Sequence, residues 1–162
     1  MPLPGKPPRE SRVEMTELVL PSDANHLGTV FGGKVMQWID ICGAIACGRH
    51  CRKPVVTASM DDLHFYAPIH VGEVAVLEGR VLASFHTSME CAVSVYSENP
   101  LTGERRLCTS ALLTFVALDK DGNRVEVPPV LPESEYERHQ FEEANERRRE
   151  RLARKKAKPK AL

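Results

Sequence analysis

One segment decides the fold of this chain: residues 32–50 read GGKVMQWIDICGAIACGRH. After the two glycines, apolar side chains fall on every face of a helix, and Asp40 is the only charge between Lys34 and Arg49. A helix that is apolar all round is normally buried. The sequence therefore predicts a helix over residues 34–50 that must bury itself against another layer of structure.

The segments on either side of this helix have the pattern of strands. Residues 12–20 alternate between apolar and polar side chains, less regularly at Leu18 and Leu20. Longer stretches rich in strand-forming residues follow at 55–65, 73–85, 89–98 and 105–118. Turn residues separate them, among them Ala67-Pro68 and the Asn99–Gly103 turn. Short connections favour an antiparallel sheet, with the helix against one face. The predicted fold class is α+β: an antiparallel sheet wrapped around one long central helix, with a charged C-terminal helical tail.

Composition limits the kind of protein that this chain can be. It has 162 residues, 42% of them hydrophobic, and its 22 basic residues balance 22 acidic ones. This length suits one core, and balanced charge gives no general attraction to nucleic acid or to an anionic membrane. We expect no signal peptide or membrane anchor, and five cysteines without paired spacing fit reduced thiols. The prediction is a cytoplasmic protein with neither a nucleic-acid nor a membrane partner.

The composition also divides the chain into three parts. We predict a flexible N-terminus at residues 1–9, one domain at 10–130, and a charged C-terminal helix or tail at 131–162. Residues 147–160 carry nine basic side chains against Glu150 alone. By default such a run is a solvated helix that frays into disorder.

Asp40 is the first candidate for chemistry. A carboxylate among apolar neighbours costs several kcal/mol to bury without a partner. Burial favours the protonated form and prepares such a group to act as a base or nucleophile. The alternative is a structural aspartate that meets water or pairs with a basic group. The residues alone leave both interpretations open.

Two further candidates precede the helix. Free N–H groups at Gly32-Gly33 can receive a carbonyl oxygen that is gaining negative charge. Asn25, in a polar turn, offers a donor and an acceptor, although Asn in a turn usually serves the backbone. His26 beside it is a weaker candidate base than Asp40. Asp40 lies about 10 Å along the helix axis from the glycines, so we expect that one subunit does not supply the whole site.

Two other motifs are incomplete. Residues 28–34 match the spacing of a phosphate-binding loop, but Val35 stands where the magnesium-binding hydroxyl is needed. Cys47, His50 and Cys51 lie close together on the helix but lack the second pair that a tetrahedral zinc site requires. The sequence therefore favours neither a nucleotide hydrolase nor a metal enzyme.

Several motifs agree in order and spacing with one family: DANHLG (23–28), FGG (31–33), WID (38–40), VTASMDD (56–62), AP (67–68), VG (71–72) and TSME (87–90). Together they resemble the hotdog-fold acyl-CoA thioesterases, in the subgroup of cytosolic acyl-CoA hydrolases. The resemblance covers about residues 10–130 and extends to the arginines at 147–149.

The resemblance implies an enzyme of lipid metabolism that hydrolyses acyl-CoA to free fatty acid and CoA. CoA would be part of substrate and product, with no required cofactor and no metal. In that family two subunits form a dimer with a continuous sheet, and dimers commonly assemble as a trimer of dimers, a hexamer. An Asn from the loop of one subunit acts with an Asp from the central helix of the other. Those positions are Asn25 and Asp40 here, and the thioester carbonyl would sit at the N–H of Gly33.

The resemblance also implies a set of coenzyme contacts. They map onto Ala58, Ser59 and Met60 in a strand, Thr87, Ser88 and Met89 at a corner, and Arg149 in the tail. Hydroxyl and backbone groups bind pantetheine and phosphate oxygens, while a guanidinium neutralises phosphate charge. Arg147, Arg148 and Arg151 carry the same group as Arg149, and His86 departs from the family pattern.

Three other functions are alternatives to hydrolysis. A non-catalytic acyl-CoA-binding hotdog module has no need for a costly carboxylate at position 40. A hotdog-fold 3-hydroxyacyl thioester dehydratase needs a catalytic His paired with an acid, and no His precedes His50 in the helix. A nucleic-acid arm would interleave aromatic residues with its bases, and the basic tail lacks them.

Overall fold

Five strands form one antiparallel sheet in the computed structural model, which describes residues 1–157. They are β1 (Val13–Leu18), β2 (Val55–Phe65), β3 (Val74–Ser84), β4 (Ser88–Glu98) and β5 (Arg105–Ala117). Their order across the sheet is β1-β3-β4-β5-β2, so β1 and β2 are the edge strands. The predicted α+β class and the antiparallel sheet are confirmed.

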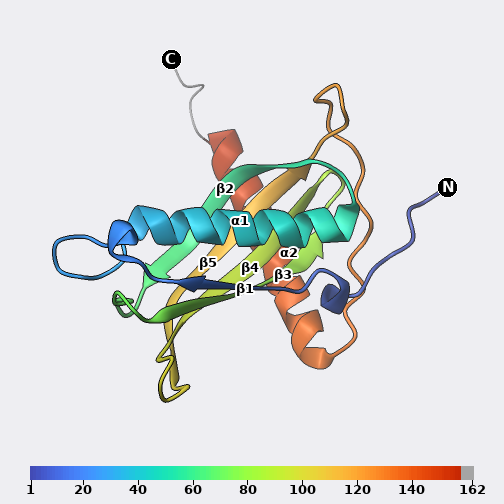
Figure 1. Cartoon of the computed structure of the whole chain (residues 1–162). Coiled ribbons are helices and arrows are strands. Elements are labelled where there is room, and N and C mark those ends of the chain that lie inside the picture. The colour runs from blue at the N-terminus through green and yellow to red at the C-terminus, as the bar shows by residue number, and fades with distance from the viewer. Residues whose placement is uncertain (158–162) are drawn as a thin grey trace.

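The long helix α1 (Gly32–Cys51) crosses one face of the sheet and contacts all five strands (Figure 1). It begins two residues before the predicted start, because the carbonyl oxygen of Phe31 accepts hydrogen bonds from the N–H groups of Lys34 and Val35. It ends where Arg52 adopts a left-handed conformation, with a φ of 54°. A short 3-10 helix, η2 (Pro21–Asp23), lies before it in the chain.

Two glycines let α1 approach the sheet closely. A Cβ added to Gly43 of the helix would lie 2.8 Å from Cε2 of Phe115. A Cβ added to Gly79 of β3 would lie 2.7 Å from the Sγ of Cys42. Both distances are shorter than a real contact, so the absence of side chains at these positions allows the central packing.

The prediction that α1 is buried on every side is wrong for the single chain. Met36, Ile41 and Ile45 are 39%, 42% and 39% exposed. On the neighbouring strand β2, Val56 and Phe65 are 47% and 51% exposed. One sheet covers only one side of a helix, so the apolar residues on the other side are left uncovered.

The second helix, α2 (Glu135–Ala157), lies behind the sheet, on the face opposite α1 (Figure 1). Buried Ala144 and half-buried Phe141 pack there against Leu82 and Ala83 of β3. The described part of the tail is therefore a docked helix instead of the solvated one expected by default. Residues 158–162, the end of the predicted tail at 131–162, lie outside the described residues. No helix within residues 1–157 is long and apolar enough to cross a membrane.

The N-terminal residues contact the rest of the chain. The N–H of Lys6 donates to the carbonyl of Pro129, and the N–H of Leu131 donates to the carbonyl of Lys6, both at 2.9 Å. The short 3-10 helix η1 (Pro8–Glu10) contacts β3. Part of the segment predicted to be flexible, residues 1–9, is thus held in place, while the three-part division of the chain remains a prediction.

Candidate active site

Asp40 lies where the buried side of α1 meets the exposed side, and it is half-buried. The Oγ1 of Thr57 on β2 donates a hydrogen bond to its Oδ1 at 2.6 Å. This is the short distance typical of a hydroxyl donating to a carboxylate. No basic side chain of residues 1–157 forms an ion pair with Asp40. The structure thus orients this carboxylate without neutralising it.

Thr57 was missing from the predicted site residues. It lies in the motif at 56–62, but the sequence does not show which helix residue its side chain meets. A bulge between Thr57 and Ser59 shifts the register of β2 against β5. Simple strand alternation therefore could not identify Thr57 as the partner of Asp40.

The start of α1 offers free backbone donors, as predicted for Gly33. Gly32 and Gly33 are the first two residues of the helix, and their N–H groups have no acceptor within residues 1–157. Both glycines are exposed, and a Cβ added to Gly33 would meet nothing within 4 Å. A ligand oxygen can therefore approach these N–H groups.

Asn25 organises the loop before the helix. Its Oδ1 accepts a hydrogen bond from the N–H of Leu27 at 2.9 Å, and its Nδ2 donates to the Oγ1 of Thr29 at 3.0 Å. The backbone role of an Asn in a turn is thus present. The N–H of Phe31 donates to the carbonyl of Asp23 at 3.0 Å, which holds the loop at the start of α1. The structure therefore brings Asn25 to the Gly33 end of the helix, and Asp40 lies further along with Thr57.

The predicted coenzyme contacts on β2 lie on an edge strand. Ala58 is exposed, whereas Ser59 and Met60 are half-buried. Ala58 occupies the bulge, and Ser59 donates from its Oγ to the Oδ2 of Asp61 at 3.2 Å. This stretch therefore presents irregular backbone and a hydroxyl at the free edge of the sheet.

The three predicted contacts at residues 87–89 differ in accessibility. Met89 is fully buried among the core residues on the α1 side of the sheet. The side chain of Met89 therefore offers no exposed surface to a ligand in the single chain, because inward-facing strand positions fill the core. Ser88 is 9% exposed, and its Oγ accepts a hydrogen bond from the Nη1 of Arg148 at 3.3 Å. Thr87 is half-buried, and its carbonyl accepts from the N–H of Ala117.

An open groove of about 590 Å³ lies between this corner and α2. It is lined by Ser84, Phe85, His86, Asn145, Arg148, Arg149 and Leu152. The guanidinium of Arg148 lies 4.3 Å from the centre of the Phe85 ring. Burial, and then repulsion from Arg151, lowers the pKa of Arg148 from its ordinary value. Arg149 pairs with Glu146 at 2.7 Å, and both side chains are largely exposed.

Glu90 on β4 is a buried carboxylate that the sequence reasoning did not single out. It is 1% exposed. The Nη2 of Arg147 lies 2.6 Å from its Oε1, and the Nη1 of Arg151 lies 2.8 Å from its Oε2. The available signal was an acid followed by seven uncharged residues, since Glu98 at the end is the only other acid of the strand predicted at 89–98. The sequence could not reveal its partners, because they lie on a helix more than fifty residues later.

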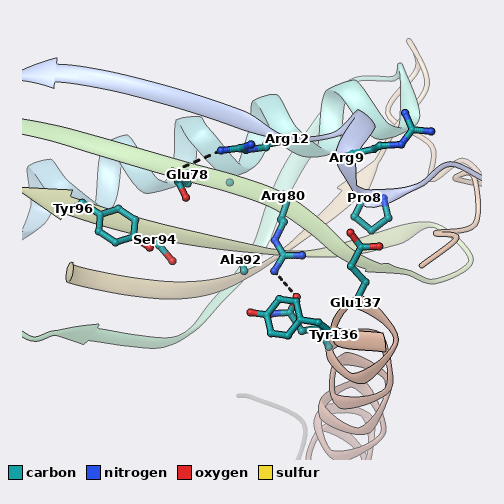
Figure 2. Close-up of a pocket in the computed structure, with 12 residues that line it drawn as sticks. Pro8, Arg9, Arg12, Glu78, Arg80, Ala92, Ser94, Tyr96, Tyr136 and Glu137 are labelled. Carbon is teal, nitrogen blue, oxygen red and sulfur yellow. Dashed lines mark hydrogen bonds and ion pairs between the residues drawn. The ribbon is translucent and has the colours of Figure 1, made fainter. Parts of the chain in front are cut away.

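A second hollow, of about 510 Å³, lies on the outer face of the sheet beside the start of α2 (Figure 2). Arg12 approaches Glu78 there at 3.8 Å. Arg80 pairs with Gln140 and lies over the ring of Tyr136. None of the predicted site residues lines this hollow, so it is separate from the surroundings of Asp40.

The cysteines and His50 of α1 belong to the core. Within residues 1–157 no group of three His, Cys, Asp or Glu side chains is placed to hold a metal ion. Burial raises the pKa of the Cys42 thiol to about 12 and also raises those of Cys47 and Cys51. The Nε2 of His50 lies 2.8 Å from the carbonyl oxygen of Pro128. These groups therefore pack and hydrogen bond within the protein.

An antiparallel sheet around a long central helix is the architecture of the hotdog fold. The family described as the Thioesterase superfamily matches residues 27–104. The chain belongs to this superfamily, as its identity to the following relatives also shows. The predicted resemblance is thereby confirmed.

Among curated proteins, the chain is similar to YkhA of Bacillus subtilis (strain 168), named an uncharacterized acyl-CoA thioester hydrolase. The two are 45% identical over 148 residues, which cover 91% of this chain and 86% of YkhA. The human cytosolic acyl coenzyme A thioester hydrolase is 35% identical over 85% of this chain. The matched part is only 37% of that longer protein.

Among solved structures, an apo-hexameric acyl-CoA thioesterase has a TM-score of 0.89 and 45% identity, covering 94% of this chain and 97% of that one. The acyl-CoA hydrolase of Staphylococcus aureus, in complex with butyryl coenzyme A, coenzyme A and coenzyme A disulfide, has a TM-score of 0.86 and 36% identity. It covers 94% of this chain and 93% of its own. Variants of that enzyme with an Asp, an Asn or a Thr replaced by alanine are similar to this chain as well.

Proposed function

We propose that this chain hydrolyses acyl-CoA thioesters to free fatty acid and CoA. The observation that carries the proposal is Asp40: a half-buried carboxylate on the central helix, oriented by Thr57 and without a basic partner in residues 1–157. A pure binding module has no use for such a group. Relatives that cover most of the chain are named acyl-CoA thioester hydrolases or acyl-CoA thioesterases, which supports the same activity.

In the proposed mechanism, negative charge develops on the thioester oxygen beside hydrogen-bond donors of the chain. The thioester carbonyl oxygen sits at the N–H of Gly33, with help from the amide of Asn25. Asp40 either removes a proton from the attacking water or attacks the carbonyl carbon itself. The tetrahedral oxyanion, stabilised by the N–H groups, then collapses and expels CoA thiolate, which takes up a proton. In the second route, water afterwards cleaves the acyl-aspartate anhydride, so both routes add one water to the acyl group.

A second copy of the chain completes the site in this proposal. Asp40 and Gly33 of one chain are about 10 Å apart along the helix axis. The uncovered apolar side of α1 and the free edge of β2 both lie next to Asp40, and each needs a partner surface. We propose a dimer with a continuous sheet through β2, assembled as a trimer of dimers. Similar proteins described as hexameric support this arrangement.

The residue assignment has a second support in the spacing of the substituted residues in the S. aureus enzyme. Its replaced Asp follows its replaced Asn by 15 positions, and its replaced Thr follows that Asp by 17. Asn25, Asp40 and Thr57 stand at the same two intervals here. This agreement adds Thr57 to the proposed catalytic set of Asn25, Asp40 and Gly33.

The proposed coenzyme site runs from β2 to the groove beside α2. Arg147 and Arg151 both bind Glu90, so Arg148 and Arg149 are the arginines that face the groove. Their guanidinium groups suit phosphate oxygens. We propose that the enzyme acts in the cytoplasm, because its cysteines are free buried thiols that suit a reducing compartment.

The test is steady-state release of thiol from acyl-CoA. Asp40→Asn keeps the shape of the side chain and should lower turnover by about 100-fold or more. Asn25→Ala should lower it by about 100-fold if the amide serves the oxyanion. Asp121→Asn, in an exposed turn that contains no proposed site residue, is the matched control and should retain parental turnover. An Asp40→Asn enzyme with near-parental turnover would rule out this proposal.

Mixing the two inactive variants tests whether the site is shared. In a two-fold dimer of one Asn25→Ala and one Asp40→Asn chain, one of the two sites has both residues intact. Random mixing should therefore restore about a quarter of parental turnover. Properly mixed oligomers that recover no activity would argue that each chain supplies its own pair.

A further inference from the structure

Glu90 connects β4 to α2 through two ion pairs. It is 1% exposed, and its two carboxylate oxygens bind different arginines: Oε1 binds Arg147 and Oε2 binds Arg151. Arg147 makes two of these bonds, from Nε at 2.9 Å and from Nη2 at 2.6 Å. Residues four apart lie on the same face of a helix. One strand carboxylate therefore holds two successive turns of α2 against the sheet.

Apolar packing does not hold these turns in place. Ala144 is the only buried residue of α2 within Glu135–Ala157. Beyond it, Leu152 is 45% exposed. At residues 147–151 the helix is therefore attached mainly by polar contacts, and the two ion pairs with buried Glu90 are the shortest of them. Losing one partner of a buried ion pair leaves the other charges unpaired, which strongly disfavours the docked position.

The arrangement fixes where the neighbouring arginine points. Arg148 follows Arg147 and is turned toward the groove, where it donates to the Oγ of Ser88 and lies over the ring of Phe85. Ser88 and Glu90 are two residues apart on β4, so their side chains leave the same face of the sheet. The ion pairs at Glu90 and the groove-lining Arg148 are therefore connected through one strand and one helix.

We infer that Glu90 is a positioning residue for the coenzyme part of the substrate: by binding Arg147 and Arg151 it holds Arg148 and Arg149 in place for phosphate groups in the groove. This inference rests on the proposed function. Glu90 itself does not touch substrate and acts through the helix. Holding the guanidinium groups in place before binding reduces the entropy lost when a phosphate is bound.

The experiment compares a long and a short thioester of the same acyl group. Butyryl-CoA carries the phosphates, whereas S-butyryl-N-acetylcysteamine lacks them. Glu90→Gln should raise KM for butyryl-CoA by about 10-fold, as expected for weakened charge-assisted phosphate contacts. Its kcat, and its kcat/KM on the short thioester, should stay parental. The matched control is Glu98→Gln, on the same strand but paired with Arg105 at the opposite end, which should change none of these values.

A double-variant comparison separates positioning from general stability. Arg148→Ala should raise KM for butyryl-CoA, and adding it to Glu90→Gln should produce little further increase, because both changes remove the same arrangement. Should Glu90→Gln fail to fold, Arg151→Gln removes one of the two ion pairs of Glu90 and should also raise KM for butyryl-CoA. Equal losses on both thioesters, multiplicative effects in the double variant, or an unchanged KM would each overturn the inference.

Failure of the proposed function can be distinguished from failure of the inference about Glu90. A parental protein that releases thiol from neither thioester would refute hydrolysis. Calorimetric binding of CoA to the full chain then tests the inference without turnover. Glu90→Gln should weaken that binding by about 10-fold, and equal affinity in the two proteins would refute the role of Glu90.

Discussion

Replacing Thr57 with valine removes one hydroxyl from beside Asp40 and keeps the shape of the side chain. The bond that is lost joins Oγ1 of Thr57 to Oδ1 of Asp40 at 2.6 Å. A hydrogen bond to a charged group contributes about 1.5–3 kcal/mol. Since about 1.4 kcal/mol corresponds to a factor of ten in rate, loss of this bond should lower kcat by about 10- to 100-fold.

The assay is steady-state thiol release with saturating acyl-CoA. Thr57→Ser is the matched control, because it keeps the donor and should lose no more than a few-fold in turnover. The melting temperature of each variant shows that the protein remains folded. A Thr57→Val enzyme with parental kcat would refute the view that this hydroxyl orients the carboxylate for the reaction.

Two further predictions concern stability. Burial lowers the pKa of His50 below its ordinary value of 6.5. The unfolded chain therefore takes up a proton near that pH that the folded chain does not, and stability should be complete above pH 6.5 and decrease as the pH falls below it. Urea unfolding of the parent and of His50→Gln measures this, and the same pH dependence in both would contradict it. Gly43→Ala should destabilise the fold by about 1–3 kcal/mol, because the new Cβ would lie 2.8 Å from Phe115. Gly48→Ala meets nothing within 4 Å and should stabilise α1 by about 0.5–1 kcal/mol. Thermal unfolding compares the two, and a more stable Gly43→Ala would show that the packing argument fails.

Local patterns predicted most of the regular structure. The strand at 55–65 was predicted with its observed bounds, because Pro54 precedes it and Ala67-Pro68 follows it. The helix was predicted within two residues at its start. Its first two residues were missed because Phe31, the N-cap residue, forms no side-chain cap hydrogen bond and so leaves no capping signal in the sequence.

The candidate site was only partly accessible from sequence. Asp40 was identified because a single charge in an apolar helix is conspicuous, and Gly33 because glycines leave helix N–H groups open. Thr57 and Glu90 were missed for a common reason. Each acts through a partner that is distant in the chain, 17 residues away for Thr57 and 57 or more for Glu90.

The sequence by itself determined which segments form helix and strand, that they build one α+β domain, and where an unusual carboxylate lies. These are properties of residues close together in the chain, where side-chain period and turn residues act directly. The tertiary structure alone decided the strand order, the meeting of Thr57 with Asp40, the docking of α2 through Glu90, and the uncovered side of α1. Those features depend on which surfaces meet in space. The hydrophobic period of one segment does not show which other segment will cover it.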